Sequence, residues 1–335
     1  MNVGIWHKID HIENEEIRVL SEALPHVLRS SLAPGTTNKY ERGWRGCKNW
    51  SASKEEVLTC PGDPFYVSIY LTSLIFSNGT KGAIIDAFYG IRWGHHLAGF
   101  QSPTDHPTVK MAFEGAQRLC SKPIKKKDPM LTEMVKSLMD THNSLDSSLH
   151  DLRFLVVIEL CYTGFLRIDE LLSTQLKHVS IKDKHMEIFL AESKTDKSRE
   201  GSTVFIARTD TAYCPVSLVE KYLNQANMSL DRDKEAFLIC RFNATKKGLK
   251  PHPTLGIGYN RTREVFKQYV KPFEDEGFNL GLHSMRAGGA TVASENDVPG
   301  PLMDIHGRWK NEKSKAGYIK HSLKKRLLVT QSLGL

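Results

Sequence analysis

Residues 281–290, GLHSMRAGGA, predict a helix whose two halves differ in character. His283 and Arg286 are three residues apart, so they share one face at the start of the helix, where backbone N–H groups also attract anions. The last four residues are Ala or Gly, so this half can pack very closely against a neighbour. By itself the stretch fits a buried packing helix as well as it fits an anion-binding site.

A second stretch, residues 163–172 (TGFLRIDELL), places a charge in an apolar run. A helix is predicted to begin near Arg167, which puts Arg167 and Glu170 on one face. A surface ion pair is the ordinary meaning of this spacing. However, Arg167 lies between Leu166 and Ile168, where a charged side chain needs a reason.

Two further stretches are rich in charged residues. Residues 192–197 (ESKTDK) form the tip of a predicted hairpin, where Lys194 could reach into a site and donate a proton, although a solvated turn lysine fits as well. Residues 306–321 (HGRWKNEKSKAGYIKH) place Tyr318 nine residues after Trp309 in a strongly basic setting. For a single tyrosine in such a helix, packing or simple exposure is the alternative.

The composition of the 335 residues is that of a globular protein with a basic excess. There are 46 Lys and Arg against 38 Asp and Glu, a formal net charge of +8 that fits a polyanionic partner such as nucleic acid. Apolar residues make up 40% and charged residues 25%, which argues against a disordered chain. The longest apolar-rich run, 154–166, is interrupted by Glu159 and is too short to span a bilayer, so no membrane partner is expected. Six scattered cysteines without a CxxC pair predict an intracellular protein with reduced thiols.

The length predicts about two domains, at roughly 150 residues each. We expect a helical domain over 1–120, a basic linker over 121–129 and a second domain over 130–335. The linker reads SKPIKKKDP, and its prolines favour an extended backbone. Such a segment could follow a phosphate backbone, serve nuclear import or be a solvated loop. Its three clustered lysines are Lys125, Lys126 and Lys127.

The first domain is predicted to be a compact bundle of four short helices without strands. Thr36 or Thr37 is expected to cap the first helix, and the other three are expected over 64–76, 82–97 and 108–120. The first helix has an apolar stripe, and its opposite face is basic. That face suits a DNA major groove, although an ordinary solvated face is the alternative. Its residues are Lys39, Arg42, Arg45 and Lys48.

The second domain is predicted to be mainly helical with a small antiparallel β-sheet. Periods of 3.6 and 2 residues distinguish its helices from its strands. Helices are expected over 131–139, 149–164, 215–226, 258–273, 282–296 and beyond 311, and strands at 178–181, 186–190 and 204–206. The fold class is therefore mainly α with a small β-sheet.

Taken in order, the four charged stretches resemble the tyrosine recombinase, or phage integrase, family. The order is Arg, then Lys on a β-hairpin, then His-x-x-Arg, then Gly-x-Trp, then Tyr nine residues later. The match covers essentially all of the second domain, from about residue 131 to the end. The first domain is similar to the family's core-binding domain, and the lysine cluster lies where the family has its linker.

The resemblance implies a phosphate-binding active site. Arg167 and Arg286 would hold the non-bridging oxygens of the scissile phosphate, for which planar guanidinium groups are suited. His283 would hydrogen-bond the same phosphate and assist proton transfer. Trp309 would pack and donate its indole N–H. Glu170 would support the region around Arg167.

The resemblance also implies the reacting groups. Tyr318 would be the nucleophile and form a 3′-phosphotyrosyl bond. Lys194 would protonate the departing 5′ oxygen, and Lys197 is an alternative for this role. A neutral phenol is a weak nucleophile, so surrounding positive charge has to favour the phenolate. His306 precedes Trp309 by three residues, but its distance to Tyr318 is twelve rather than nine, so Trp309 is preferred.

No cofactor is expected. The sequence has no Asp/Glu cluster with two-metal spacing and no GxxxxGK[ST] motif, and the covalent link would store the energy of the phosphodiester. The expected partners are double-stranded DNA and the protein itself, as a tetramer on two duplexes. A type IB topoisomerase and a domesticated DNA-binding protein that no longer cuts are the alternatives. A mobile element is the expected origin, with a nuclear location in a eukaryote and otherwise the cytoplasm or nucleoid.

Overall fold

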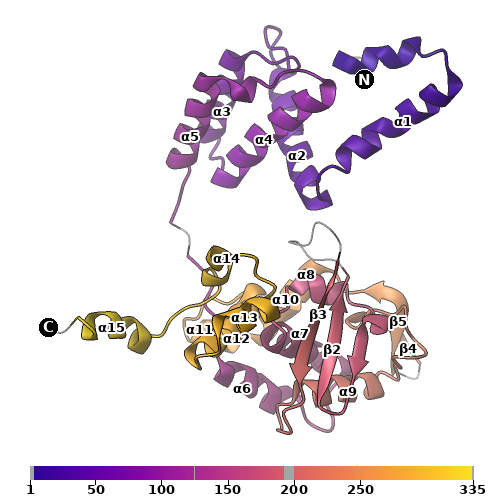
Figure 1. Cartoon of the computed structure of the whole chain (residues 1–335), viewed down its shortest axis with the longest axis vertical. Coiled ribbons are helices and arrows are strands. Elements are labelled where there is room, and N and C mark those ends of the chain that lie inside the picture. The colour runs from indigo at the N-terminus through magenta and orange to yellow at the C-terminus, as the bar shows by residue number, and fades with distance from the viewer. Residues whose placement is uncertain (1–3, 124, 192–199, 247, 334–335) are drawn as a thin grey trace. The chain divides into compact units, whose positions relative to one another are not determined.

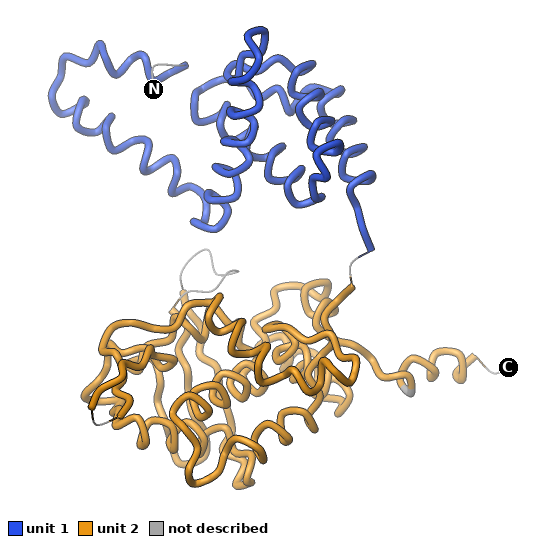
Figure 2. Tube along the Cα trace, turned by 180° about the vertical axis from the view of Figure 1, so that it is seen from behind, with its two compact units in different colours: residues 1–124 blue, residues 125–335 orange. Residues whose placement is uncertain are grey.

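The computed structural model describes residues 4–123, 125–191, 200–246 and 248–333, apart from the side chain of Lys324. The chain divides into two compact units, Met1–Ile124 and Lys125–Leu335 (Figure 2). Within the described ranges, no helix is long and apolar enough to cross a membrane.

In its described residues, unit 1 contains helices joined by turns and loops, and no strand (Figure 1). Helices α2 and α4 pack face to face, and α3 and α5 complete a core around Leu71, Phe88 and Ile91. Close contact between α2 and α4 requires Gly43, because a Cβ atom there would lie 1.9 Å from the carbonyl oxygen of Asp86. The elements are η1 (Gly4–His11), α1 (Glu15–Arg29), α2 (Pro34–Ser51), α3 (Pro64–Phe76), α4 (Lys81–Ala98), η2 (Pro103–Asp105) and α5 (Pro107–Leu119).

The sequence predicted three of these helices to within one residue, but it placed the start of α2 wrongly. The helix begins at Pro34, after Ala33 as its N-cap, and not after Thr36 or Thr37. Proline fits the first turn because its φ is already helical and its missing N–H has no partner there in any case. The hydroxyl of Thr37 instead donates back to the carbonyl oxygen of Ala33 at 3.4 Å.

Unit 2 combines ten helices with one three-stranded and one two-stranded antiparallel sheet among its described residues (Figure 1). The predicted fold class, mainly α with a small antiparallel β-sheet, is confirmed. The helices are α6 (Thr132–His142), α7 (Leu149–Thr163), α8 (Ile168–Leu172), α9 (Pro215–Gln225), α10 (Tyr259–Tyr269), α11 (Lys271–Asp275), α12 (His283–Glu295), α13 (Gly300–Gly307), α14 (Glu312–Ala316) and α15 (Leu323–Gln331). The other elements are η3 (Leu176–His178), β1 (Val179–Ile181), β2 (His185–Leu190), β3 (Ser202–Ala207), β4 (Cys240–Thr245) and β5 (Gly248–Gly256).

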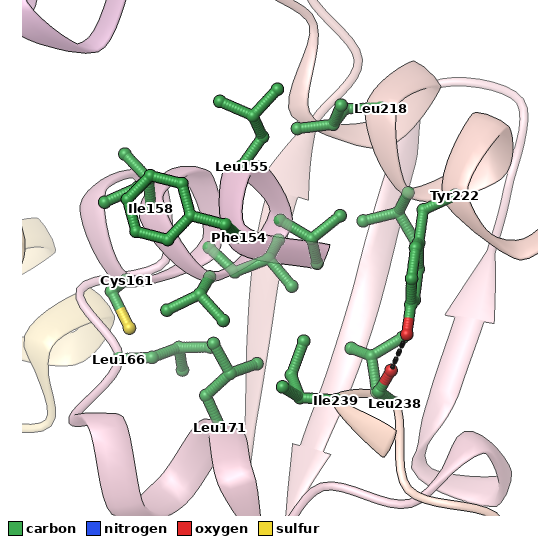
Figure 3. Packing of buried hydrophobic residues seen from close by; sticks show 14 of the residues in the cluster. Phe154, Leu155, Ile158, Cys161, Leu166, Leu171, Leu218, Tyr222, Leu238 and Ile239 are labelled. Carbon is green, nitrogen blue, oxygen red and sulfur yellow. Dashed lines mark hydrogen bonds between the residues drawn. The ribbon is translucent and has the colours of Figure 1, made fainter. Parts of the chain in front are cut away.

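Helix α7 forms the centre of unit 2, and residues 152–161 are all buried. A helix that is apolar all round is expected to be enclosed by its neighbours. Phe154, Leu155 and Ile158 lie in the same core as Leu218 and Tyr222 of α9 (Figure 3). The phenol of Tyr222 donates a hydrogen bond to the carbonyl oxygen of Leu238 at 3.0 Å, which satisfies its one polar atom inside the core (Figure 3).

Helix α12 packs against α7 with almost no space between the two backbones. A Cβ atom on Gly288 would lie 2.1 Å from the carbonyl oxygen of Met130, and one on Gly289 would lie 2.1 Å from the carbonyl oxygen of Tyr162. This confirms the close packing predicted from the small residues at 287–290. The start of α12, and with it Arg286, is therefore fixed against the core of the unit.

Several parts of unit 2 differ from the prediction, and helix α13 was not predicted at all. The helix expected over 258–273 is two helices, α10 and α11, because Pro272 cannot continue the hydrogen bonding of α10. The C-terminal helix is likewise divided into α14 and α15, and Tyr318 lies between them. The β4–β5 hairpin was not predicted, since its strands are largely exposed and β5 contains two prolines.

Candidate active site

Arg286 is the most deeply buried charge of the protein's described part, with no exposed surface. Its guanidinium donates to the backbone carbonyls of Phe165 and Gly307, the latter at 2.6 Å. These carbonyls come from the α7–α8 connection and the end of α13, so three parts of the chain meet at one side chain. Because both acceptors are backbone carbonyl oxygens, they fix the orientation of the Arg286 guanidinium group.

Two aromatic rings lie against this guanidinium. The central carbon of the Arg286 guanidinium is 5.0 Å from the ring centroid of Trp309 and 4.8 Å from that of Tyr318. The two rings are themselves 5.7 Å apart, tilted by 37°. Cation–π attraction strengthens when the cation is desolvated, as it is here. The structure thus brings together three of the residues singled out from the sequence.

Arg167 and Glu170 also belong to this site, since the charges of both act on Arg286. Arg167 is the N-cap residue of α8, and its Nη1 donates to Oε1 of Glu170 at 2.5 Å. Its backbone N–H donates to Oε2 of the same carboxylate at 2.9 Å. Burial alone would raise the pKa of Glu170, but Arg308 and Arg167 outweigh it and hold that pKa below its ordinary value. The carboxylate therefore stays charged and holds both arginines.

Arg308 belongs to this site, although the sequence analysis did not select it. Its side chain is 8% exposed, and its Nη2 lies 2.8 Å from Oε2 of Glu170. The only sequence signal was its place between Gly307 and Trp309. From the local sequence, a basic residue at this position is expected to be exposed to solvent. Its burial depends on a carboxylate that only the fold brings close.

The site carries more positive charge than its one carboxylate, Glu170, balances. Burial, followed by the neighbouring charges of Arg167 and Arg308, lowers the pKa of Arg286 to about 10, so it remains charged near neutral pH. At this site, three buried N–H groups have no hydrogen-bond partner among the described residues: Nε of Arg286, Nε of Arg308 and Nε1 of Trp309. Buried donors without partners are rare and call for a ligand. An anion with several acceptor oxygens would satisfy them.

The segment that carries Tyr318 is fastened to α12. The hydroxyl of Thr291 donates to the carbonyl oxygen of Tyr318 at 3.4 Å and accepts from the backbone N–H of Lys320 at 3.1 Å. The ammonium group of Lys320 also pairs with Asp128 at 2.6 Å. Arg286 and the tyrosine segment are thus both attached to one helix of the same chain.

The remaining residues considered for the site differ in where the structure places them. His283 is the exposed first residue of α12. Lys194 and Lys197 lie outside the described residues. His306 donates from its ring to the carbonyl oxygen of Thr163 at 2.7 Å, and burial lowers its pKa, so it stabilises the α7–α8 connection.

The predicted DNA-binding residues lie on exposed surfaces of the two units. All four basic residues of α2 are exposed, and Arg42 pairs with Asp86 of α4. Of the linker lysines, Lys127 donates to Oδ1 of Asn279 at 2.6 Å. No group of three or more His, Cys, Asp or Glu side chains is placed to hold a metal ion in the ranges that the structure describes.

Comparison with known proteins gives a consistent result. The sequence model of the Phage integrase family matches residues 130–325, well over half of the chain. A protein of Selenomonas ruminantium described as an integrase/recombinase xerD homolog is 25% identical over 312 residues, which cover 92% of this chain and 87% of the relative.

Two solved structures show a similar fold. The XerH site-specific recombinase, in a post-cleavage complex with a palindromic difH substrate, gives a TM-score of 0.60 at 15% identity, covering 89% of this chain and 79% of the other. A lambda integrase dimer bound to a COC' core site gives a TM-score of 0.53 at 12% identity, covering 89% and 75%.

Proposed function

Because the chain belongs to the phage integrase family of tyrosine recombinases, we propose that it recombines DNA at specific sites through a covalent bond between Tyr318 and a DNA phosphate. The family consists of enzymes that cut and rejoin DNA strands, and the chain is an enzyme of this class. What the proposal adds is the identity of the reacting residues and the route of the reaction.

In the proposed reaction, the phenol oxygen of Tyr318 attacks the scissile phosphorus atom. The bond to the 5′ oxygen breaks, the DNA 3′ end becomes joined to the tyrosine, and the departing 5′ oxygen takes up a proton. Lys194, with Lys197 as the alternative, is the proposed donor of this proton, and His283 assists. Rejoining is the same reaction in reverse with a different 5′ hydroxyl, so the number of phosphodiester bonds is conserved and neither ATP nor a metal ion is required.

The observation that carries this proposal is the arrangement around Arg286. A buried guanidinium lies between Trp309 and Tyr318, and three buried N–H donors nearby lack partners among the described residues. Attack on a phosphodiester builds additional negative charge on the phosphate oxygens, and cations already in place lower that barrier. Arg167 and Arg286 are the proposed contacts to the two non-bridging oxygens.

A suicide substrate with a nick close to the cleavage site tests the proposal. The short fragment diffuses away after cleavage, so wild-type protein is expected to accumulate a covalent adduct. Tyr318→Phe should bind the same DNA and form no adduct, and EDTA should leave the wild-type reaction unchanged. Binding without an adduct in the wild type would instead support a DNA-binding protein that no longer cuts. Relaxation of supercoils without strand exchange would support a type IB topoisomerase.

We also propose that the protein assembles as a tetramer on two DNA duplexes. None of the described side chains of helix α15 is buried, and Leu323, Leu327, Leu328 and Val329 are all exposed, so the helix can dock on another copy. Leu327→Asp should reduce assembly on DNA, measured by light scattering or native mass spectrometry. Unchanged assembly would argue against this role for α15.

DNA binding by unit 1 and by the linker lysines remains part of the proposal, as does origin in a mobile element. The curated relative is bacterial, so nothing in the comparisons supports the expected eukaryotic nucleus. We propose action on DNA in a bacterial nucleoid instead. Terminal repeats flanking the gene would support the mobile-element origin, and their absence would weaken it.

A further inference from the structure

Arg308 adopts a backbone conformation that residues with a Cβ atom rarely take. Its φ is 55° and its ψ is 41°, the left-handed region in which glycine is the usual residue at the end of a helix. Phe165, in the α7–α8 connection, also has a positive φ, of 45°. Unfavourable conformations persist where surrounding contacts enforce them, and they gather at functional sites.

Backbone hydrogen bonds form the turn itself, from the N–H of Arg308 to the carbonyl of Ile305 and from the N–H of Trp309 to that of Asp304, and the Arg308 guanidinium adds contacts beyond the turn. Nη2 donates to Oε2 of Glu170 at 2.8 Å and to the carbonyl oxygen of Phe165 at 2.9 Å. Nη1 donates to the carbonyl oxygen of His306 at 2.8 Å. A side chain whose only role was to end α13 would need none of these bonds, since the turn is formed by the backbone.

Arg308 is bonded to the same acceptors as both arginines proposed to hold the phosphate. It shares the Glu170 carboxylate with Arg167, one oxygen atom contacting each guanidinium. It shares the carbonyl oxygen of Phe165 with Arg286. Moving Arg308 would therefore alter the partners of both other arginines.

We propose that Arg308 is a positioning residue that keeps Arg167 and Arg286 directed toward the scissile phosphate, an inference that rests on the proposed function. Glu170 is buried and has to be neutralised. With Arg308 in place, one of the two carboxylate oxygens is satisfied without the guanidinium of Arg167. Arg167 already donates to the other oxygen. Without Arg308, the whole carboxylate would draw on Arg167 and hold its guanidinium away from the phosphate.

Single-turnover adduct formation on the suicide substrate tests this role with the full-length protein. We expect Arg308→Ala to slow adduct formation about 100-fold, the effect of misplacing a reacting group by about 1 Å, while DNA affinity changes little. Arg308→Gly suits the left-handed turn better, yet it should be as slow as Arg308→Ala, because the guanidinium rather than the turn is missing. Arg208→Ala is the matched control. It removes another Arg–Glu pair of unit 2, between Arg208 and Glu220, and should leave the rate unchanged.

A double variant separates positioning from a general structural role. In Arg308→Ala/Glu170→Gln the neutral amide no longer attracts Arg167, so the double variant should react at least tenfold faster than Arg308→Ala. A double variant as slow as the single one, or a wild-type rate in Arg308→Ala or Arg308→Gly, would overturn the proposal.

A second measurement keeps the test independent of cleavage. Inorganic phosphate should raise the unfolding midpoint of the wild type by occupying the arginine site. The increase in the midpoint should be smaller for Arg308→Ala, and it should be larger again for the double variant than for Arg308→Ala. If wild-type protein forms no adduct, the proposed function fails, and this series still decides whether Arg308 positions the other arginines. An equal phosphate effect in all three proteins would reject the role of Arg308.

Discussion

The contact between α12 and α7 makes Gly289→Ala the sharpest test of how the site is built. A Cβ atom at residue 289 would lie 2.1 Å from the carbonyl oxygen of Tyr162 and 2.8 Å from Cε1 of Phe165. A close carbon–oxygen contact needs about 3.3 Å, so the methyl group is short of space by roughly 1 Å. The obstructing oxygen belongs to the backbone of α7, so a side-chain rotation cannot relieve the overlap and the two helices have to separate.

The magnitude follows from that separation. Overpacking of a closed core typically costs about 1–3 kcal/mol, and the better helix propensity of alanine offsets up to about 1 kcal/mol of this. For a unit of this size, each kcal/mol lowers the unfolding midpoint by about 2–4 °C. Arg286 lies three residues before the substitution on the same helix, so a displacement near 1 Å should also slow adduct formation by about 100-fold.

Calorimetry of the full chain and single-turnover adduct formation measure the two effects. Gly115→Ala in α5 provides the matched control, because a Cβ atom there meets nothing within 4 Å. The same chemical change should stabilise unit 1 by up to about 1 kcal/mol and leave cleavage unaffected. If Gly289→Ala has the stability and the adduct-formation rate of the wild type, the close contact between α12 and α7 is refuted. The inference that this contact fixes the position of Arg286 is then refuted as well.

Three further predictions follow from other features. Glu159 is 3% exposed, and burial raises its pKa to about 8 from 4.5, so its contribution to stability is full below pH 4.5 and is lost as the pH rises toward 8. Urea unfolding should therefore show stability falling by up to about 1.4 kcal/mol per pH unit in this window, and Glu159→Gln should flatten the fall. A mixture of the Tyr318→Phe and Arg286→Ala proteins should form no adduct, because Tyr318 and Arg286 contact each other within one chain. Adduct formation by the mixture would indicate that one copy supplies its tyrosine to the active site of another. Arg45→Ala and Lys48→Ala should each reduce the slope of log affinity against log salt by about 0.9, and an unchanged slope would remove α2 from the DNA interface.

Elements with strong local signals could be predicted from the sequence. Helix α3 begins after Asp63, whose carboxylate caps the backbone N–H of Phe65, and Pro64 occupies the first turn, so its start is defined locally. The β2–β3 pair has the alternation that one buried face imposes, with Ile188 opposite Val204. The β4–β5 hairpin lacks that alternation because neither face is deeply buried.

The order of the charged stretches singled out Arg286, Trp309 and Tyr318, which the structure brings together, but it did not indicate how they are held there. The stacking of Trp309 and Tyr318 on Arg286 depends on three connections that only the fold brings together. Arg308 could not be selected, because its buried state depends on Glu170, 138 residues earlier in the chain. A local pattern carries no information about a partner at that distance.

The ion pair between Asp128 and Lys320 has one more consequence. Asp128 directly follows the linker lysines, and Lys320 lies two residues after the tyrosine. The same carboxylate accepts a hydrogen bond from the backbone N–H of Asn279 at 2.9 Å. The residue at which the chain enters unit 2 is thus connected directly to the segment that bears the phenol.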